Sequence, residues 1–219
     1  MKAPWQRHFF YRKQVLKTTW KLRLVIVLVL AAILVLPQRF WTAQIGRSLV
    51  CKEQVDRSDA LLLENFDTDY LVFEHAAALK KAGIASRVFV PASEGTSSSI
   101  PSEIARQFVD VMARRAGLQE FEIIPFQEKE PISLNAAKQI RDVLTREHIK
   151  SVVVVAPGLR SRRSAMVYSA ALTPSGIRVG CAPVLDGRPI ETWATTWHGI
   201  QEAFLQFFKL QYYRFYVLL

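Results

Sequence analysis

The segment with the clearest potential for chemistry is a cluster of arginines that follows a run of valines. Residues 151–155 read Ser-Val-Val-Val-Val, which is typical of a buried strand, and Gly158 follows shortly after. We expect a turn at this glycine and then a helix that carries Arg160, Arg162 and Arg163. The free N–H groups and positive dipole end of a helix start favour an anion, and guanidinium groups suit a phosphate, a pyrophosphate or an acidic sugar. We rank Arg163 first, because three residues of helix past Arg160 return it to the same face. A solvated basic helix face is the alternative.

Other polar residues stand at predicted helix starts and strand ends. Ser133 and Asn135 begin a predicted helix, where they either contact the same ligand or, as we favour, cap the helix. Glu103, one turn into an earlier helix, is either a catalytic acid or a residue that compensates the helix dipole. Glu64 follows the first predicted strand in an acidic loop. Glu103 and Glu64 are the only candidates for catalysis, so the sequence leaves open whether the protein is an enzyme.

Several kinds of site lack support. The four histidines are scattered and no Cys/His cluster has metal spacing, so we expect no metal centre. No G-x-G-x-x-G, Walker or G-x-S-x-G motif occurs, so we expect no nucleotide cofactor and no hydrolase nucleophile elbow. Cys51 and Cys181 would be able to pair in an oxidising compartment, but two cysteines establish no framework, and we favour two unpaired thiols.

These residues need a scaffold, and from Asp59 the chain alternates between strand and helix patterns. Strands are predicted at 60–63, 87–90, 121–126, 151–155 and 178–184. Helices are predicted at 70–82, from a Ser99–Pro101 opening to Gly117, at 134–148, around 160–172, and over about twenty residues from Thr192. Five such units predict an α/β fold: one Rossmann-like parallel sheet of about five strands with helices on both faces. Ligands of such sheets lie at the carboxyl ends of the strands, near the point where strand order reverses. The loops to inspect are 64–69, 92–100, 127–135, 156–163 and 186–188.

The N-terminal part differs from the rest in charge and hydropathy. The first fifty residues hold nine Lys or Arg and no acidic residue, which leaves only +1 of the formal charge of +10 for the remainder. Seven of these cations precede the apolar run Leu24–Leu36, which Pro37 ends. We therefore predict a cytoplasmic leader at 1–19, a single-pass transmembrane signal anchor at 20–37, a stem at 38–57 and an extracytoplasmic domain at 58–219. A cleaved signal peptide and a buried core helix are the alternatives.

The same patterns indicate partners. A nearly neutral folded part argues against nucleic acid, whereas the basic leader suits the anionic lipids of the inner (cytoplasmic) membrane. The C-terminal helix carries more aromatic side chains than one helix face can bury, with Lys209 and Arg214 among them. Part of this helix should cover the sheet, and the rest should meet the outer leaflet or a membrane-protein partner. The aromatic residues are Phe204, Phe207, Phe208, Tyr212, Phe215 and Tyr216.

Several segments, taken in order from about Asp59 to Tyr213, carry a resemblance to a known family. They are the strand Asp59–Leu63, the helix end Ala77–Gly83, Glu103, the stretch Glu130–Asn135, the strand and arginines of Val152–Arg163, and the closing Trp197–Arg214. In this layout the chain resembles the SanA/ElyC/YdcF-like family of bacterial envelope proteins. The resemblance implies an N-terminal anchor, a Rossmann-like domain and a role in envelope integrity, peptidoglycan precursor or lipid-carrier metabolism. The chain departs from the family at Glu64–Phe66, where a Gly-rich turn is usual.

Together these patterns predict a membrane-anchored protein of cell-envelope or surface-polysaccharide biogenesis. It would bind an anionic, lipid-linked sugar phosphate through the Arg160–Arg163 helix start, with Ser133 and Asn135. A non-catalytic subunit of a larger membrane complex, with a degenerate site, is the second hypothesis. A phosphate-transferring or hydrolytic enzyme is the third, and it requires a general base that the sequence does not identify.

Overall fold

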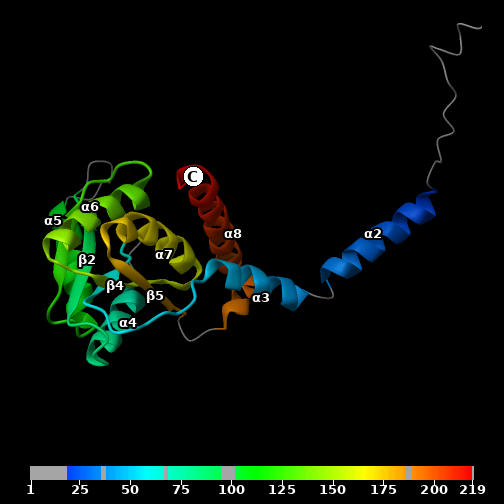
Figure 1. Cartoon of the computed structure of the whole chain (residues 1–219). Coiled ribbons are helices and arrows are strands. Elements are labelled where there is room, and N and C mark those ends of the chain that lie inside the picture. The colour runs from blue at the N-terminus through cyan, green and yellow to red at the C-terminus, as the bar shows by residue number, and fades with distance from the viewer. Residues whose placement is uncertain (1–18, 36–37, 67–68, 95–101, 186–188, 219) are drawn as a thin grey trace, which may run out of the picture. The chain divides into compact units, whose positions relative to one another are not determined.

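The computed structural model describes residues 19–35, 38–66, 69–94, 102–185 and 189–218 (Figure 1). The chain divides into two compact units, Met1–Trp41 and Thr42–Leu219. Three of the predicted features lie outside the described residues: most of the leader, the helix opening at Ser99–Pro101 and the loop at 186–188.

The first unit contains helix α2 (Trp20–Val35) and the beginning of helix α3 (Gln38–Leu49). Apart from Lys21 and Arg23 near its start, α2 is apolar throughout. Within the described residues, no single helix is both long and apolar enough to cross a membrane. The α2 segment to Ile33 and α3 meet that requirement, by length and composition, only as a bent pair.

The second unit is built on a five-stranded sheet in which every pairing is parallel. The strands lie in the order β3-β2-β1-β4-β5, as in Rossmann-like sheets. Leu61 pairs with both Val88 and Val153, so β1 lies at the centre of the sheet. The strands are β1 (Ala60–Leu63), β2 (Arg87–Ser93), β3 (Glu122–Phe126), β4 (Ser151–Pro157) and β5 (Arg178–Val184).

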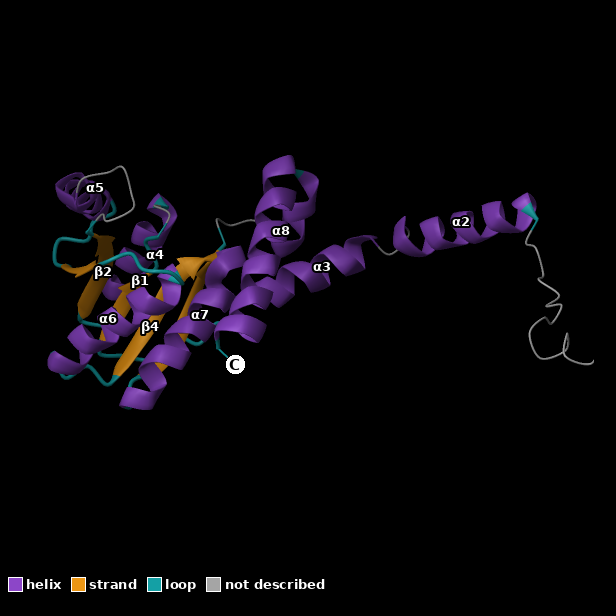
Figure 2. Ribbon diagram, turned by 90° about the horizontal axis from the view of Figure 1, so that it is seen from above, coloured by secondary structure: helices purple, strands orange, loops and turns teal. Residues whose placement is uncertain are grey.

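Helices cover both faces of this sheet, as Figure 2 shows. The side chains of one face, among them Leu62 and Val154, pack against α6 (Ile132–Arg146) and α7 (Gly158–Leu172). The alternate residues, among them Leu61 and Val153, pack against α4 (Tyr70–Lys81) and α5 (Ser102–Arg115). This period of two along each strand buries both faces. The prediction of a parallel α/β sheet of about five strands with helices on both faces is confirmed.

The C-terminal part was predicted as one helix from Thr192, and the structure divides it. A 3₁₀ segment, η2 (Ile190–Thr195), comes first, and α8 (Trp197–Tyr212) and a π-helical turn (Tyr213–Val217) follow. A second 3₁₀ segment, η1 (Thr173–Ser175), follows α7. The break before α8 falls at Thr196, which is extended and whose hydroxyl accepts a hydrogen bond from the Gly199 N–H. A threonine cap of this kind starts a new helix rather than continuing the previous one.

The predicted stem also has structure. The second half of α3 packs on α8, where Leu49 joins Ala203 and Leu210 in a small apolar cluster. The Trp193 Nε1–H donates to the Thr42 carbonyl oxygen at 3.0 Å. Residues 42–49 therefore belong to the folded unit that was predicted to begin at residue 58.

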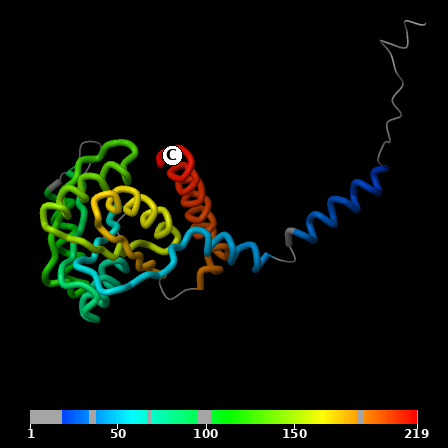
Figure 3. Tube along the Cα trace, viewed as in Figure 1, coloured from blue at the N-terminus to red at the C-terminus, as the bar shows by residue number. Residues whose placement is uncertain are grey.

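The prediction of two unpaired thiols is wrong, because Cys51 and Cys181 form a disulfide. The chain after α3, which Figure 3 traces towards β1, runs beside the edge strand β5. There Gln54 forms an antiparallel bridge with Cys181. The bridge brings together two cysteines that are 130 residues apart in sequence, a separation that gave the sequence no local signal of pairing.

Candidate functional site

The order of the strands defines where a site should lie. From β1 the chain moves outward through β2 and β3, then returns to place β4 on the other side of β1. The direction of winding reverses between β1 and β4, and ligands of open parallel sheets bind beyond the carboxyl ends of the strands at such a point. Glu64 directly follows β1, and α7 directly follows β4.

A pocket of about 340 Å³ opens at this place, and we call it the switch-point pocket. Its walls come from the segments after β1 and β3, from the first turns of α6 and α7, and from the end of α8. The lining residues are Phe66, Glu128, Glu130, Ile132, Ser133, Arg160, Arg163, Lys209, Tyr212 and Tyr213. Its volume lies at the lower end of the range for small-molecule sites.

Arg163 forms the buried inner wall of the pocket, and only 6% of the residue is exposed. Its Nη1–H donates to the Ser133 hydroxyl at 2.9 Å, and its Nε–H donates to Gln206 Oε1 at 3.3 Å. Its Nη2 lies 3.8 Å from Glu64 Oε1. The guanidinium also lies over the ring of Tyr213, 5.8 Å from its centroid. Each nitrogen of this group therefore has a partner within the protein.

Two further buried groups lie near this cation. Glu64 is 1% exposed, and its backbone N–H donates to the Val155 carbonyl, which holds the end of β1 against β4. Tyr168 is also buried, and its hydroxyl has no hydrogen-bond partner among the residues that the structure describes. Burial raises the pKa of the Tyr168 hydroxyl, and the charge of Glu64 raises it further, while Arg163 acts in the opposite direction.

Arg160 reaches the same pocket from the turn before Arg163. Its Nη2 lies 3.5 Å from Glu202 Oε1, and that oxygen also accepts a hydrogen bond from Gln206 Nε2 at 3.0 Å. A polar network thus connects Arg160 and Arg163 through two side chains of α8. Lys209 adds an exposed cation at the rim of the pocket.

Four of the residues chosen from the sequence come together here. Arg160, Arg163 and Ser133 line the pocket, and Glu64 lies beside Arg163. The capping prediction for Ser133 is wrong, because α6 starts at Ile132, two residues earlier than predicted, and its cap position, Pro131, has no side-chain hydrogen bond. Instead the Ser133 hydroxyl accepts from Arg163, and its backbone N–H donates to the Tyr213 hydroxyl at 3.2 Å.

The other four do not line the pocket. Arg162 is exposed on α7, and Glu103 is exposed on α5, where it accepts a hydrogen bond from Gln107. Asn135 does not cap α6 either: its side-chain N–H groups donate to the carbonyls of residues 129 and 130, which orders the loop beside the pocket. Gly158 starts α7 with no left-handed backbone, contrary to the tight turn that we expected of it. A Cβ at this position would lie 2.6 Å from Leu185 Cδ2 and 3.1 Å from the Val184 carbonyl oxygen, so the glycine lets α7 begin close to the end of β5.

Most of the residues that the sequence reading missed lie on α8 or on the turn that directly follows it. Glu202, Gln206, Lys209 and Tyr213 are spaced by four, three and four residues, which places them on one helix face. The signal was present as polar groups on the inner face of an otherwise aromatic helix. The acidic wall of Glu128 and Glu130, after β3, was also missed.

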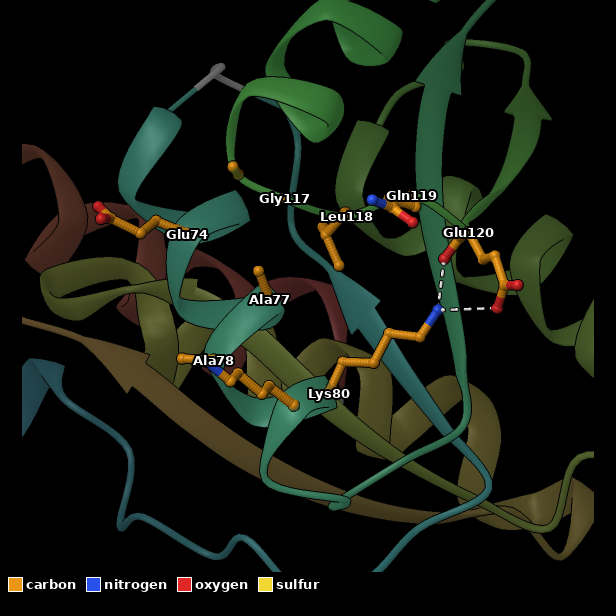
Figure 4. Close-up of a pocket in the computed structure, with 10 residues that line it drawn as sticks. Glu74, Ala77, Ala78, Lys80, Gly117, Leu118, Gln119 and Glu120 are labelled. Atoms are coloured by element: carbon orange, nitrogen blue, oxygen red, sulfur yellow. Dashed lines mark hydrogen bonds and ion pairs between the residues drawn. The ribbon is translucent and has the colours of Figure 1, made fainter.

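Two other hollows lie outside the switch point. One, of about 640 Å³, lies between α4 and the segment after α5, and its walls combine small residues with charged ones. Figure 4 shows Ala77 and Ala78 beside Glu74 and the Lys80–Glu120 contact. Lys80 donates to the Glu120 carbonyl oxygen at 2.8 Å and is engaged there. A second hollow, of about 540 Å³, lies between the start of α7, η2 and the start of α8, and its walls are mostly apolar or uncharged. In the part of the chain that the structure describes, no group of three or more His, Cys, Asp or Glu residues is placed to hold a metal ion.

The fold and the pocket define an α/β protein with a charged, partly aromatic pocket at the switch point of a Rossmann-like sheet. Comparisons with models of protein families, with curated proteins and with solved structures found no match to this chain.

Proposed function

We propose that this chain is a membrane-anchored, extracytoplasmic protein that binds a sugar phosphate in the switch-point pocket, as part of cell-envelope or surface-polysaccharide biogenesis. The observation that carries the proposal is the convergence of Arg160, Lys209 and the Ser133 hydroxyl on one hollow of about 340 Å³. Guanidinium, ammonium and hydroxyl groups are the donors that bind phosphate oxygens in proteins.

The mixed polarity of the walls favours a sugar phosphate over an inorganic anion. Phe66 and Tyr212 supply flat apolar surfaces, and Glu128 and Glu130 supply carboxylates. An anion alone would be repelled by these acids, whereas the hydroxyl groups of a sugar would donate to them. A ligand with its phosphate towards Arg160 and its sugar ring between the aromatic and acidic walls satisfies both halves of the pocket.

Two observations support an anchored protein whose folded part lies outside the cytoplasm. The apolar helix α2 follows a leader that carries cations and no acids, which is the arrangement that keeps an N-terminus in the cytoplasm. The Cys51–Cys181 disulfide is of a kind that persists in oxidising compartments and is rare in the cytosol. The resemblance to envelope proteins agrees with this placement, and a lipid-linked ligand would be within reach of such a protein.

Calorimetry with glucose 1-phosphate tests the site. Loss of one charge-assisted hydrogen bond costs about 1.5–3 kcal/mol, so Arg160→Met and Lys209→Met should each weaken binding by about ten-fold or more. Arg162→Met is the matched control, since it removes a cation from the same helix outside the pocket. Equal affinities in all three variants would show that the ligand binds elsewhere.

One observation favours a second function, that of a non-catalytic subunit whose ligand site has been lost. The guanidinium of Arg163 is fully engaged by Ser133, Gln206 and Glu64, so the most buried cation of the site already has a protein anion beside it. This function predicts that no sugar phosphate binds and that the chain co-purifies from membranes with a defined larger complex.

A further inference from the structure

The outer face of α8 presents an apolar stripe that the fold leaves uncovered. Trp197, Ile200, Phe204, Phe208 and Tyr212 follow one another at intervals of three or four residues, and each is between 41% and 73% exposed. This spacing places all five on one side of the helix. Phe204 and Phe208 contact each other with ring centroids 4.7 Å apart, so the stripe is continuous rather than scattered.

The stripe does not belong to the face of α8 that packs on the rest of the domain. The residues of α8 that are buried are Ala203, Gln206 and Leu210, and they occupy the opposite face of the helix. Large apolar side chains in a row on the solvent side cost solubility, and such patches commonly mark surfaces that bind another apolar phase.

The charges around the stripe indicate what it meets. From Trp197 to Leu219 the sequence contains Lys209 and Arg214 and a single acid, Glu202, which is engaged by Arg160 and Gln206. In sequence these two cations stand on either side of Tyr212, the last residue of the stripe, and the guanidinium of Arg214 lies over the ring of Phe215, 5.4 Å from its centroid. Aromatic residues between flanking cations are typical of helices that lie in the headgroup region of an anionic bilayer.

The path of the chain agrees with a lipid surface. The second unit begins at Thr42, and the Thr42 carbonyl accepts the hydrogen bond from Trp193, four residues before α8 begins. The first residues of the folded unit therefore lie beside η2 and α8. Tyr212 belongs both to the stripe and to the rim of the switch-point pocket.

We propose that the stripe of α8 lies on the outer surface of the anionic membrane that holds the anchor, and so keeps the mouth of the switch-point pocket at the lipid headgroups. This inference rests on the proposed function in one respect, the anchor, and it names the source of the ligand: a sugar phosphate that is attached to a lipid in that leaflet. The lipid would remain in the bilayer while its polar head enters the pocket beside Lys209 and Tyr212.

Fluorescence quenching by brominated lipid tests the contact. The full chain is reconstituted into vesicles of phosphatidylcholine and phosphatidylglycerol, in which the phosphatidylcholine is either unlabelled or brominated near the headgroup. The emission of Trp197 is obtained by subtracting the fluorescence of the Trp197→Phe variant from that of the wild-type chain. We expect brominated lipid to reduce this emission by about two-fold or more, because an interfacial tryptophan lies at headgroup depth. Trp193 is the matched control, since its indole is half-buried against Thr42 and should keep its emission.

A second fluorophore controls for an effect of the Trp197→Phe substitution on folding. Phe208→Trp in the Trp197→Phe background places the fluorophore in the middle of the stripe, and its emission should also be quenched. In vesicles without phosphatidylglycerol, the quenching of both tryptophans by brominated lipid should be weaker. Equal emission of Trp197 with and without brominated lipid would overturn the proposal. So would a doubled particle mass that Phe204→Ser abolishes, because a second copy of the chain would then cover the stripe.

Membrane anchoring and ligand binding are measured in separate experiments. Resistance of the chain to alkaline extraction from the same vesicles reports the anchor, and calorimetry with glucose 1-phosphate reports the pocket. Unquenched Trp197 in a chain that resists extraction and binds sugar phosphate contradicts the docking of α8 alone.

Discussion

Glu64 and Arg163 form a buried ion pair across the switch point, with 3.8 Å between Glu64 Oε1 and Arg163 Nη2. Glu64 directly follows β1 and Arg163 lies in the second turn of α7, the helix that follows β4, so the pair connects the segments after two central strands at the carboxyl ends of the sheet. Desolvation offsets much of the attraction between two buried charges, so the pair specifies an arrangement more than it adds stability. Removal of only one partner should therefore be costly.

Arg163→Met should lower the free energy of unfolding by about 3–5 kcal/mol, because it leaves the Glu64 carboxylate buried without its cation. Chemical denaturation of the purified chain measures the change. Arg162→Met, on the exposed side of the same helix, should change stability by no more than about 0.5 kcal/mol.

The double variant Glu64→Gln/Arg163→Met separates charge from packing. It removes both ions and should recover most of the stability that Arg163→Met loses, because neither charge remains to be desolvated. If the double variant is as unstable as the sum of the two single variants, the two side chains are not coupled and the ion pair has no structural role.

Tyr168→Phe should leave the stability unchanged or raise it by about 1 kcal/mol. The Tyr168 hydroxyl is buried with no hydrogen-bond partner in the described part of the chain, and such a group costs free energy when it leaves water. Thermal unfolding of the two proteins at neutral pH measures the difference. A clear fall in the melting temperature would mean that the hydroxyl makes a hydrogen bond in solution.

Reduction of the Cys51–Cys181 disulfide should destabilise the folded unit by about 2–4 kcal/mol, since the bond closes a loop of more than one hundred residues. Denaturant midpoints with and without dithiothreitol measure this effect, and Cys51→Ser/Cys181→Ser should match the reduced wild-type chain. Recovery of two free thiols from the unreduced protein after unfolding would contradict the pairing.

Asp59 should make the stability depend on pH in the acid range. The backbone N–H of Lys150 donates to its carboxylate at 2.8 Å and lowers the pKa of Asp59 below the ordinary value of 3.8. Desolvation opposes this shift. The pKa is lowered further by the hydroxyl and the backbone N–H of Ser151 and by the charge of Arg178. Because the folded-state pKa is the lower one, the stabilisation is present above about pH 4 and is lost as the pH falls through the folded-state value. Asp59→Asn should remove about 1 kcal/mol at pH 7, a small value because the carboxylate is exposed. The difference from wild type should shrink as the pH falls below 3.8 and through the folded-state pKa, and a difference that is constant with pH would exclude the carboxylate charge as its cause.

The layout of the sheet was predictable because local pattern and tertiary role agree. The run of Leu61, Leu62 and Leu63 and the run of valines after Ser151 are apolar on both faces, and only a central parallel strand buries both. The bounds of β1 and β5 were predicted to the residue. The starts of α6 and α8 were less accurate: α6 begins two residues before the predicted Leu134, and α8 begins after the Thr196 cap rather than at Thr192.

Only some residues of the candidate site were predictable from the sequence. Arg160, Arg163 and Ser133 were found because the carboxyl ends of parallel strands share one edge, so residues after different strands meet. Gln206 and Glu202 were not found, because the path of α8 over this edge is set by packing of Ala203 and Leu210 against Leu49. The sequence did not indicate that Glu64 would supply the anion beside Arg163, since an acidic residue after a strand is equally typical of a solvated loop.

The most direct test of the central claim is calorimetric titration of the full chain, in detergent, with glucose 1-phosphate, glucose and inorganic phosphate. A pocket with a cationic wall and a wall of aromatic and acidic groups predicts saturable binding of glucose 1-phosphate, at least about ten-fold tighter than that of either fragment, and loss of that preference in Arg160→Met but not in Arg162→Met. Equal, weak binding of all three compounds by the wild-type chain would contradict the claim that the switch-point pocket recognises a sugar phosphate.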